Sequence, residues 1–325
     1  MSPQTDVCFE LLTDLDQLEA LAPAWNRLLD LSPCNRAFSS PIWFTATCRI
    51  ERCKPCVAVA WRSGQLVALL PIALNLSGDE ACFPNSMCNY NDLVAAEGNI
   101  DIAGRLLDYA RAALAPRARL SLRWLSERSI CARAAGGCRK EQDYMFVSLA
   151  HGWEGFLASK SRNFRKSIGQ ALRRAEIAGI VVRRIDPEQF KPEQLPRLFL
   201  ELHIRRFGEQ SAFCRSSANR LFILQALPVL FREGRVIPFG LYEGDRCIGI
   251  DLSLMDEGKL CTWNGGYPPE AERWSPGKLL IAAGIHQAIE WNLREYDLLR
   301  GSQEWKTHWA TGVHSVGRLD YPAGL

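Results

Sequence analysis

The chain has 325 residues, of which 47% are apolar and 23% charged, and its net charge is +3. These values are typical of a globular protein long enough for two domains, and so small a net charge gives no general attraction for nucleic acid. The first residues include acids where a signal peptide needs a basic start, and no run of 18 apolar residues occurs. We therefore expect a cytoplasmic protein with no transmembrane segment.

Twelve cysteines are present, nine of them before residue 150. A chain of this length and apolarity does not need a disulfide framework. Cys53 and Cys56 have the spacing of a metal-binding or redox pair, but no second pair or nearby His completes a zinc set. We interpret the cysteines as buried free thiols and predict no metal site, with a metal or redox role for this pair as the alternative.

The first half of the chain alternates helical and strand patterns. Apolar residues recur at helical spacing from residue 15 to 31, and two strand patterns flank a turn at Ser63-Gly64. The elements expected in chain order are a helix at Leu15–Leu31, a hairpin at Val57–Leu74, a helix at Ile102–Leu114, and strands at Leu120–Leu125 and Tyr144–Leu149.

The second half repeats this order. A hairpin pattern recurs 180 residues after the first, with its turn at Glu243-Gly244, and is again followed by a helix and a strand. Such an offset indicates a duplicated unit, so we predict two related α/β domains at residues 1–150 and 151–325. The expected elements are helices at Ser161–Ala178, Leu195–Phe207 and Leu221–Phe231, a hairpin at Ile237–Leu254, a helix at Gly277–Asn292 and a strand at Tyr296–Leu299.

Positive charge is concentrated at the start of the second half. Residues 151–184 hold eight basic side chains against two acids. Three interpretations stay open for the basic helix within this segment: a solvated face, a clamp on an anionic substrate or an adenosine phosphate, and a surface for RNA.

The turn before the helix at residue 277 is the clearest candidate for a phosphate site. Ser275 can cap the helix, Pro276 fits its first position, Gly277 allows close approach, and Lys278 supplies a cation. The first amides of a helix have no partner within it and attract anions. A plain helix start with a solvated lysine is the alternative. A P-loop is excluded, because Glu272 stands where that motif needs glycine.

Five segments together resemble the GNAT acyltransferase superfamily, and within it the tandem-GNAT branch of BioF2-like or CelD-like proteins related to the FemABX peptidyltransferases. They follow the family's order along nearly the whole chain: Phe38–Trp43, Phe156–Lys166, Leu202–Arg206, Trp274–Leu280 and Asp297–Lys306.

The resemblance implies two tandem GNAT-like domains, each a mixed, mostly antiparallel sheet flanked by helices. It implies an acyl-CoA co-substrate between two parting central strands, with its pyrophosphate at Arg273, Ser275, Gly277 and Lys278. Pro276 departs from the family's glycine-rich turn, which leaves another acyl carrier open. The equivalent entry in the first half, residues 96–100, lacks this turn, so we expect a degenerate first domain and one donor site per chain.

Acyl transfer needs a base, a group that stabilises the oxyanion and a proton for the leaving thiolate. His203 has a suitable pKa for a base, and Asp251 is a carboxylate within an apolar strand, which is costly unless it has a role or a partner. Tyr267 could protonate the thiolate, or pack as an ordinary aromatic beside a glycine turn. Glu304, after the last strand of the repeat, completes the predicted catalytic set.

Four further residues are predicted to bind the acceptor: Arg165, Trp263, Asn264 and Lys306. Glu304 and Lys306 follow a strand end, where sites gather in α/β folds, and could orient the acceptor or balance phosphates. A surface ion pair between Glu304 and Lys306 is the alternative.

The leading hypothesis is an acyl-CoA-dependent N- or O-acyltransferase, most simply an acetyltransferase, in which an amine or hydroxyl attacks the thioester directly. Its acceptor would be a small molecule or, by the resemblance alone, a saccharide or peptide precursor of the cell envelope. One alternative is a Fem-like aminoacyltransferase that uses aminoacyl-tRNA, the one case in which nucleic acid is expected as a partner. Another is a binding protein of GNAT fold without activity.

Overall fold

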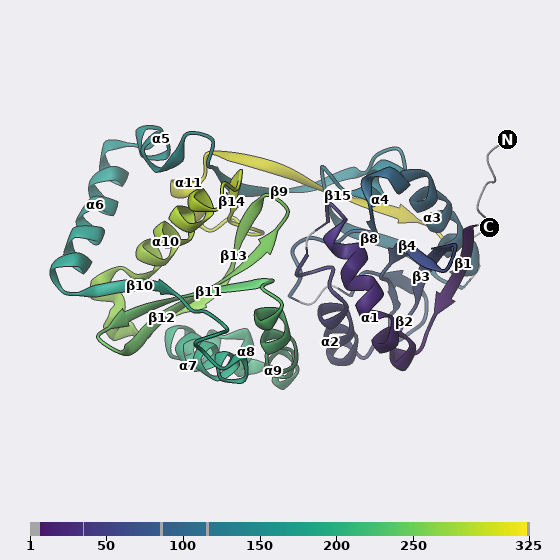
Figure 1. The fold of residues 1–325 in the computed structure, drawn as a ribbon, viewed down its shortest axis with the longest axis horizontal. Helices are drawn as coiled ribbons and strands as arrows, with labels where there is room; N and C mark the ends of the chain where they lie inside the picture. Colours follow the sequence, from purple (N-terminus) through teal and green to yellow (C-terminus); the bar gives the residue numbers. More distant parts are fainter. Residues whose placement is uncertain (1–6, 35, 85–86, 115–116, 324–325) are drawn as a thin grey trace. The chain divides into compact units, whose positions relative to one another are not determined.

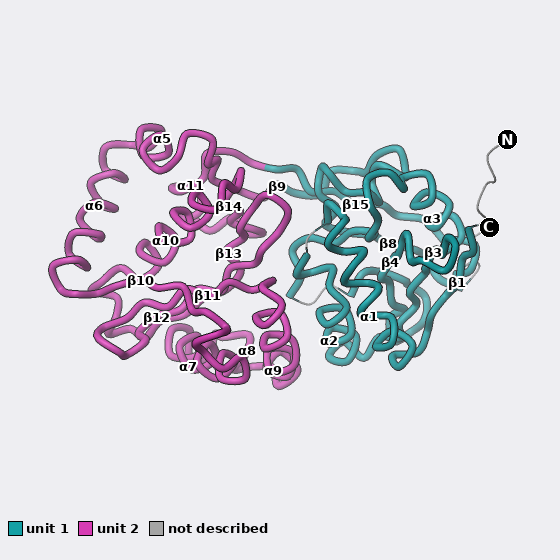
Figure 2. The backbone as a smooth tube through the Cα atoms, viewed as in Figure 1, with its two compact units in different colours: residues 1–143, 314–325 teal, residues 144–313 magenta. Residues whose placement is uncertain are grey.

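The computed structural model describes residues 7–34, 36–84, 87–114 and 117–323. It divides into two compact units, residues 1–143 with 314–325 and residues 144–313 (Figure 2). The chain passes from one unit to the other within two strands, β9 (Arg139–Ser148) and β15 (Gly312–Tyr321). The last twelve residues, which the sequence assigned to the second half, belong to unit 1 because β15 pairs with β8 (Arg119–Ser126) there.

Unit 1 is built on two groups of strands with helices packed on them (Figure 1). The apolar stripe predicted for the first helix is buried in full, and the predicted hairpin turns at Ser63 and Gly64, both with positive φ. One group contains β1 (Val7–Leu12), β3 (Val57–Arg62), β4 (Gln65–Leu70) and β7 (Val94–Ala95). The other contains β15, β8, β6 (Glu80–Cys82), β5 (Ala73–Leu74) and β2 (Lys54–Pro55). The helices are α1 (Leu15–Asp30), α2 (Pro41–Glu51), α3 (Ile100–Leu114) and α4 (Ile130–Ala134).

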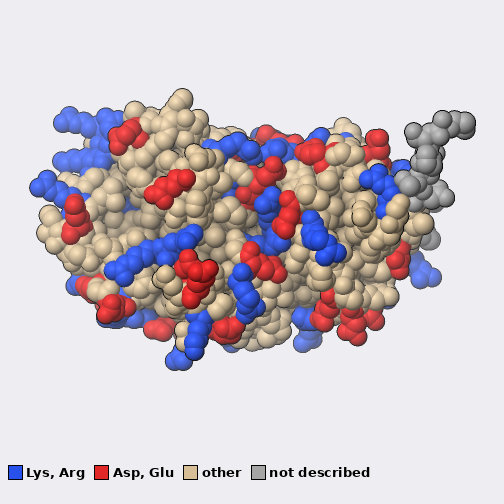
Figure 3. Space-filling model, in the orientation of Figure 1, with Lys and Arg blue, Asp and Glu red and all other residues tan. Residues whose placement is uncertain are grey.

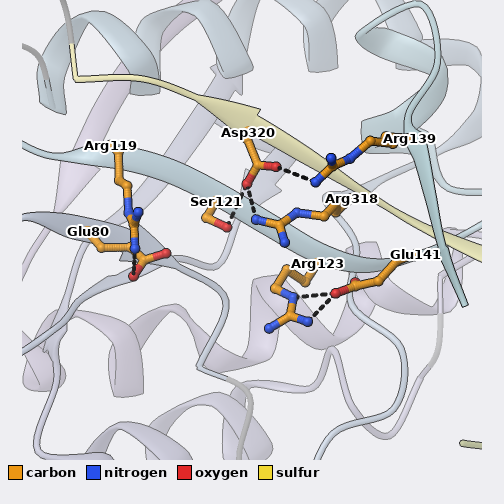
Figure 4. A network of polar contacts seen from close by, with 8 residues as sticks. All are labelled: Glu80, Arg119, Ser121, Arg123, Arg139, Glu141, Arg318 and Asp320. Atoms are coloured by element: carbon orange, nitrogen blue, oxygen red, sulfur yellow. Dashed lines mark hydrogen bonds and ion pairs between the residues drawn. The ribbon is translucent and has the colours of Figure 1, made fainter.

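A polar network covers the β8 and β15 surface of unit 1 (Figure 4). Asp320 accepts hydrogen bonds from Ser121 at 3.0 Å and Arg318 at 2.5 Å, and Arg139 lies 3.6 Å from it. The hydrogen bond between Arg318 and Asp320 is the main cause that raises the pKa of Arg318 and lowers the pKa of Asp320. Both shifts favour the charged forms. The network ties β15 to the sheet of unit 1.

The two cysteines singled out in the sequence lie between α2 and β3, on either side of β2. Cys53 belongs to the end of α2, where its amide bonds the Cys48 carbonyl at 3.2 Å after the left-handed residue Arg52. Cys56 is 2% exposed in the core beside β3. All twelve cysteines are free thiols.

Unit 2 is one sheet with helices on both faces. Its strand order is β10 (Ile180–Arg184), β11 (Val236–Glu243), β12 (Arg246–Asp256), β13 (Lys259–Gly266), β14 (Glu295–Asp297) and β9. One face carries α5 (Gly152–Ala158), α6 (Arg162–Ile177), α10 (Pro276–Glu290) and α11 (Glu304–Trp309), and the other carries α7 (Leu195–Phe207), α8 (Ala212–Arg215) and α9 (Ser217–Arg232) (Figure 1). No described helix is long and apolar enough to cross a bilayer.

The centre of this sheet is buried on both faces. Ile250, Leu252 and Leu254 of β12 are 0% exposed, and Asp251 and Ser253 alternate with them onto the face that carries α10. The predicted alternation of apolar and polar residues along β12 is therefore confirmed. The polar residues are buried in the domain rather than exposed to solvent.

The strands β13 and β14 form the parallel pair of the sheet, and they stay together for three residues. Lys259, Leu260 and Cys261 pair with Glu295, Tyr296 and Asp297, after which β13 continues to Gly266 without a paired residue in β14. A bulge at Trp263 lies in the continuing part of β13, between the pairs of Leu252 and Ser253. The strands therefore part at Thr262.

Helix α7 lies directly on the free end of β13. A Cβ atom at Gly266 would lie 2.4 Å from the Cα atom of His203, a backbone atom that cannot turn aside. Glycine is required at this position by the close approach of the helix, and the contact holds α7 against the point where the site residues gather.

We predict that Gly266→Ala lowers the free energy of unfolding of unit 2 by about 1–3 kcal/mol, the usual cost of overpacking. Urea denaturation measures the change. Gly169→Ala is the matched control, because nothing lies within 4 Å of a Cβ there and alanine favours helix α6 by about 0.5–1 kcal/mol. Equal stability of the two variants would contradict the close approach of α7.

Candidate functional site

The start of α10 has two cations beside it, and the amides of Lys278 and Leu279 donate to the Ser275 carbonyl at 3.0 and 3.3 Å. Pro276 occupies the first turn, and a Cβ at Gly277 would have no atom within 4 Å. Ser275 stands at the capping position in a left-handed conformation, φ 57° and ψ 57°, and its side chain makes no cap. The predicted Ser275 cap is therefore wrong, because the left-handed backbone turns its hydroxyl away from the helix amides.

The hydroxyl of Ser275 instead accepts a hydrogen bond from Arg174 of α6, at 3.0 Å. In the opposite direction, Lys278 of α10 donates to the hydroxyl of Ser167 on α6, at 2.6 Å. These two bonds fix a guanidinium and an ammonium beside the start of α10, and two cations so placed attract an anion. The arrangement suits a phosphate or pyrophosphate.

Arg174 was not singled out in the sequence as a donor-binding residue, because its helix contains four other cations. Its distinguishing feature is its reach to α10, which no pattern in α6 shows. The predicted residue Arg273 points elsewhere: it stacks on Trp274 at 5.0 Å and pairs with Glu243 at 3.2 Å, with 63% of its side chain exposed.

Asp251 is the centre of a buried polar group beneath α10. Its carboxylate accepts hydrogen bonds from Ser253 at 2.7 Å and from Thr262 of β13 at 2.8 Å. Burial raises the pKa of Asp251 to about 6, although both hydrogen bonds act to lower it. A carboxyl with such a pKa can exchange a proton near neutral pH.

A second buried charge lies where β14 ends. Asp297 is 0% exposed, and it accepts hydrogen bonds from Lys259 at 3.1 Å and from the Leu299 amide at 2.7 Å. Lys306 of α11 reaches the same segment and donates to the carbonyls of Leu299 at 3.2 Å and Arg300 at 2.5 Å. Burial lowers the pKa of Lys306 to about 8, and Asp297 acts against this shift.

Residues 162–307 match the family model for the acetyltransferase (GNAT) domain. The second half of the chain is a GNAT domain. The matched residues include α6, the turn before α10, the parting strands and Lys306, and the match supports an acyltransferase. No curated protein sequence matches the chain.

Solved structures extend the likeness to the whole chain. FemX superposes with a TM-score of 0.67 at 13% identity, over 96% of this chain and 97% of FemX. L-PGS from Bacillus licheniformis gives a TM-score of 0.59 at 13% identity, over 96% of this chain and 93% of that one. At such identities the likeness is one of fold. It confirms the predicted α/β fold of two tandem GNAT-like domains.

Within the GNAT domain, His203 is enclosed rather than open to solvent. Its Nδ1 lies 2.9 Å from the Gly265 carbonyl, and its ring packs against Phe199, Phe207 and Phe213. Burial lowers the pKa of His203, so the ring is neutral near pH 7 and Nδ1 donates to the carbonyl. This placement fixes the free end of β13.

Tyr267 lies under the guanidinium of Arg206, 4.3 Å from its ring centre. Burial raises the pKa of the Tyr267 phenol, with Arg206 acting against it. Arg206 also pairs with Glu272 at 2.6 Å, and this links α7 to the loop that leads into α10. The predicted proton donor is therefore held at the entry to the phosphate turn.

The remaining predicted residues lie on different parts of the domain. Asn264 accepts a hydrogen bond from the Gly265 amide at 3.0 Å, and Trp263 is the half-buried bulge residue of β13. Arg165 is exposed and donates to the Lys160 carbonyl.

Glu304 is exposed, whereas Lys306 is 4% exposed and bonded to backbone carbonyls. The alternative of a Glu304–Lys306 surface pair is wrong, because Lys306 points into the domain.

Lys306 predicts a pH-dependent stability. Its folded pKa of about 8 lies below the ordinary value of 10.5, so between these values the unfolded chain binds more protons than the folded one. The Lys306 contribution to the free energy of unfolding therefore rises with pH across this window, by an amount on the order of 2 kcal/mol.

Urea denaturation of the wild type and Lys306→Met at pH 7.5 and pH 10 measures this contribution as the difference between the two proteins. We expect the wild type to gain stability relative to the variant as the pH rises. A constant difference would show that Lys306 titrates normally in the folded state.

Proposed function

We propose that the protein is an acyl-CoA-dependent acyltransferase in which α10 holds the pyrophosphate of the donor. The supporting observation is the pair of cations, Arg174 and Lys278, fixed at the start of α10. Strand β13, helix α10 and strand β14 form a parallel crossover unit, so the start of α10 lies at the carboxyl end of β13. Ligands of α/β sheets bind at this end, and β13 and β14 part there.

The acyl arm of the donor would lie along β13 beyond Thr262, where β14 has turned away. The acceptor amine or hydroxyl would then attack the thioester carbon directly. We propose Asp251 as the base and Tyr267 as the proton donor to the thiolate. Trp263 and Asn264 of β13, together with Lys306, would border the acceptor. His203 would support the site from the other face of the sheet by holding the end of β13. Glu304, Arg165 and Arg273 are exposed and would lie outside the donor site.

The acceptor class is proposed from the resemblance alone. We propose a small molecule or a saccharide or peptide precursor of the cell envelope, with acetyl-CoA as the simplest donor. Both amines and hydroxyls are compatible with direct attack, because this mechanism needs only a nucleophile that is held next to the thioester carbon.

The aminoacyl-tRNA alternative has one observation in its favour. Lys and Arg side chains gather over α6 in Figure 3, and Arg162, Arg165, Lys166 and Arg173 of this helix are exposed. A basic helix face suits the phosphates of RNA. This face is separate from the inward contacts of Arg174, so the two donors can be tested with different variants.

We predict that acetyl-CoA raises the stability of the wild type by about 2.7 kcal/mol when its concentration is 100-fold the dissociation constant. Arg174→Ala combined with Lys278→Ala should abolish this gain, because it removes both cations from the start of α10. Arg165→Ala is the matched control, since it removes a cation of α6 that does not reach α10, and it should keep the gain.

Thermal denaturation with CoA, acetyl-CoA and longer acyl-CoAs measures the effect. The absence of a shift for the wild type with every acyl-CoA would overturn the proposed donor. An unchanged shift in the double variant would place the phosphates elsewhere.

For the alternative donor, we predict that the wild type retains at most weak tRNA in a filter-binding assay at low salt. Tight retention that falls steeply with salt, and that is lost in the Arg162→Ala, Arg165→Ala, Lys166→Ala triple variant, would favour aminoacyl-tRNA. The triple variant leaves Arg174 and Lys278 in place, so acetyl-CoA binding by the same protein serves as the control.

A further inference from the structure

The buried polar group around Asp251 has a single outlet. Ser253 is 0% exposed, Asp251 is 7% exposed, and Tyr296 of β14 is 0% exposed. Thr262, the second hydroxyl bonded to the carboxylate, is half-buried. Among the described residues that bond Asp251, Thr262 alone therefore reaches the surface of the domain.

The strand geometry explains where this outlet opens. Leu260 packs in the core beneath α10, and Thr262 follows two residues later on the same face of β13. Cys261 is the last residue of β13 that pairs with β14. The Thr262 hydroxyl thus lies at the point where the strands part, which is where the proposed function places the acyl group.

We propose that Thr262 is a catalytic residue that relays the proton of the attacking acceptor to Asp251. This inference rests on the proposed function. Thr262 already donates its proton to Asp251 Oδ1, and a hydroxyl oxygen can accept two hydrogen bonds, so one lone pair is left after the contact with the Tyr296 phenol. The acceptor group can donate to that lone pair.

The bonds and protons of this relay are all accounted for when the acceptor is an amine. The nitrogen attacks the thioester carbon, a C–N bond forms and the C–S bond breaks. The nitrogen gives one proton to the Thr262 oxygen while the hydroxyl proton of Thr262 passes to Asp251. The thiolate takes a proton from the Tyr267 phenol, and the proton held by Asp251 later returns to the Tyr267 oxygen through water, so the products are the amide and the CoA thiol.

The groups around Asp251 are neutral, which leaves its carboxylate as the base of the cluster. In the strand register, Phe239 of β11 and Gly265 of β13 lie opposite Asp251. Tyr296 approaches from β14, and burial followed by the charge of Asp251 raises the pKa of its phenol. Helix α10 contributes Gly284, whose Cα lies against the Tyr296 hydroxyl.

Ser253 provides a matched control for Thr262. Both hydroxyls donate to the same carboxylate, and both bonds lower its pKa. Removing either one should raise the pKa of Asp251 above about 6, so the acid limb of the rate profile moves to higher pH in both variants. Only the loss of Thr262 also removes the path to the acceptor.

The experiment compares Thr262→Val, Thr262→Ser and Ser253→Ala with the wild type, using acetyl-CoA with water as the acceptor and measuring released CoA thiol from pH 5 to pH 9. We expect Ser253→Ala to shift the acid limb and keep the plateau rate. Thr262→Val should shift the limb and lower the plateau by about 10- to 100-fold, within the range of a proton-transfer contribution. Thr262→Ser should restore both.

Equal plateau rates for Thr262→Val and Ser253→Ala would overturn the relay and leave Thr262 as a structural donor. A second readout does not need turnover: NMR titration of ¹³C-labelled Asp251 should show a pKa near 6 that rises in both variants, and an ordinary carboxyl value would also overturn the proposal. Failure of acetyl-CoA to stabilise the wild type identifies failure of the proposed function instead, because that measurement involves neither hydroxyl.

Discussion

The early end of β14 is the constraint on which the GNAT domain depends. Asp297 is fully buried and uses one oxygen for Lys259 and the other for the amide of Leu299. The second bond draws the chain out of the strand, and Leu299 takes a left-handed conformation with φ 57°. Lys306 then holds the carbonyls of Leu299 and Arg300 from the other side. Strand β13 is left to continue alone, and the gap beside it is where a donor can lie.

The buried charges of this region are costly for stability. A buried ion pair such as Asp297 with Lys259 often contributes little net stability, because both groups lose their hydration. Asp251 likewise pays for burial through a raised pKa, although two hydroxyls bond it. Groups with shifted pKa values gather at functional sites. Here burial shifts the pKa values of both Asp251 and Lys306.

Several features of the site were predictable from local sequence, and others were not. The period of the apolar residues gave α7 and the β11–β12 hairpin, and the Ser-Pro-Gly-Lys run gave the start of α10. The sequence also indicated that Asp251 faces away from Ile250 and Leu252. It could not show that Thr262, eleven residues later, bonds that carboxylate, because the register of β13 includes a bulge at Trp263. Nor could it single out Arg174 among the cations of α6.

By itself, the sequence determined the elements, their repeated order and the family, because these follow from the spacing of apolar residues and from short motifs. The tertiary structure decided which polar groups meet. Lys306 looked like a surface residue beside Glu304, yet packing of α11 buries it against the end of β14. Ser275 looked like a helix cap, yet its left-handed backbone turns its hydroxyl to Arg174. Such contacts join residues far apart in the chain, and they depend on register and packing that local patterns do not encode.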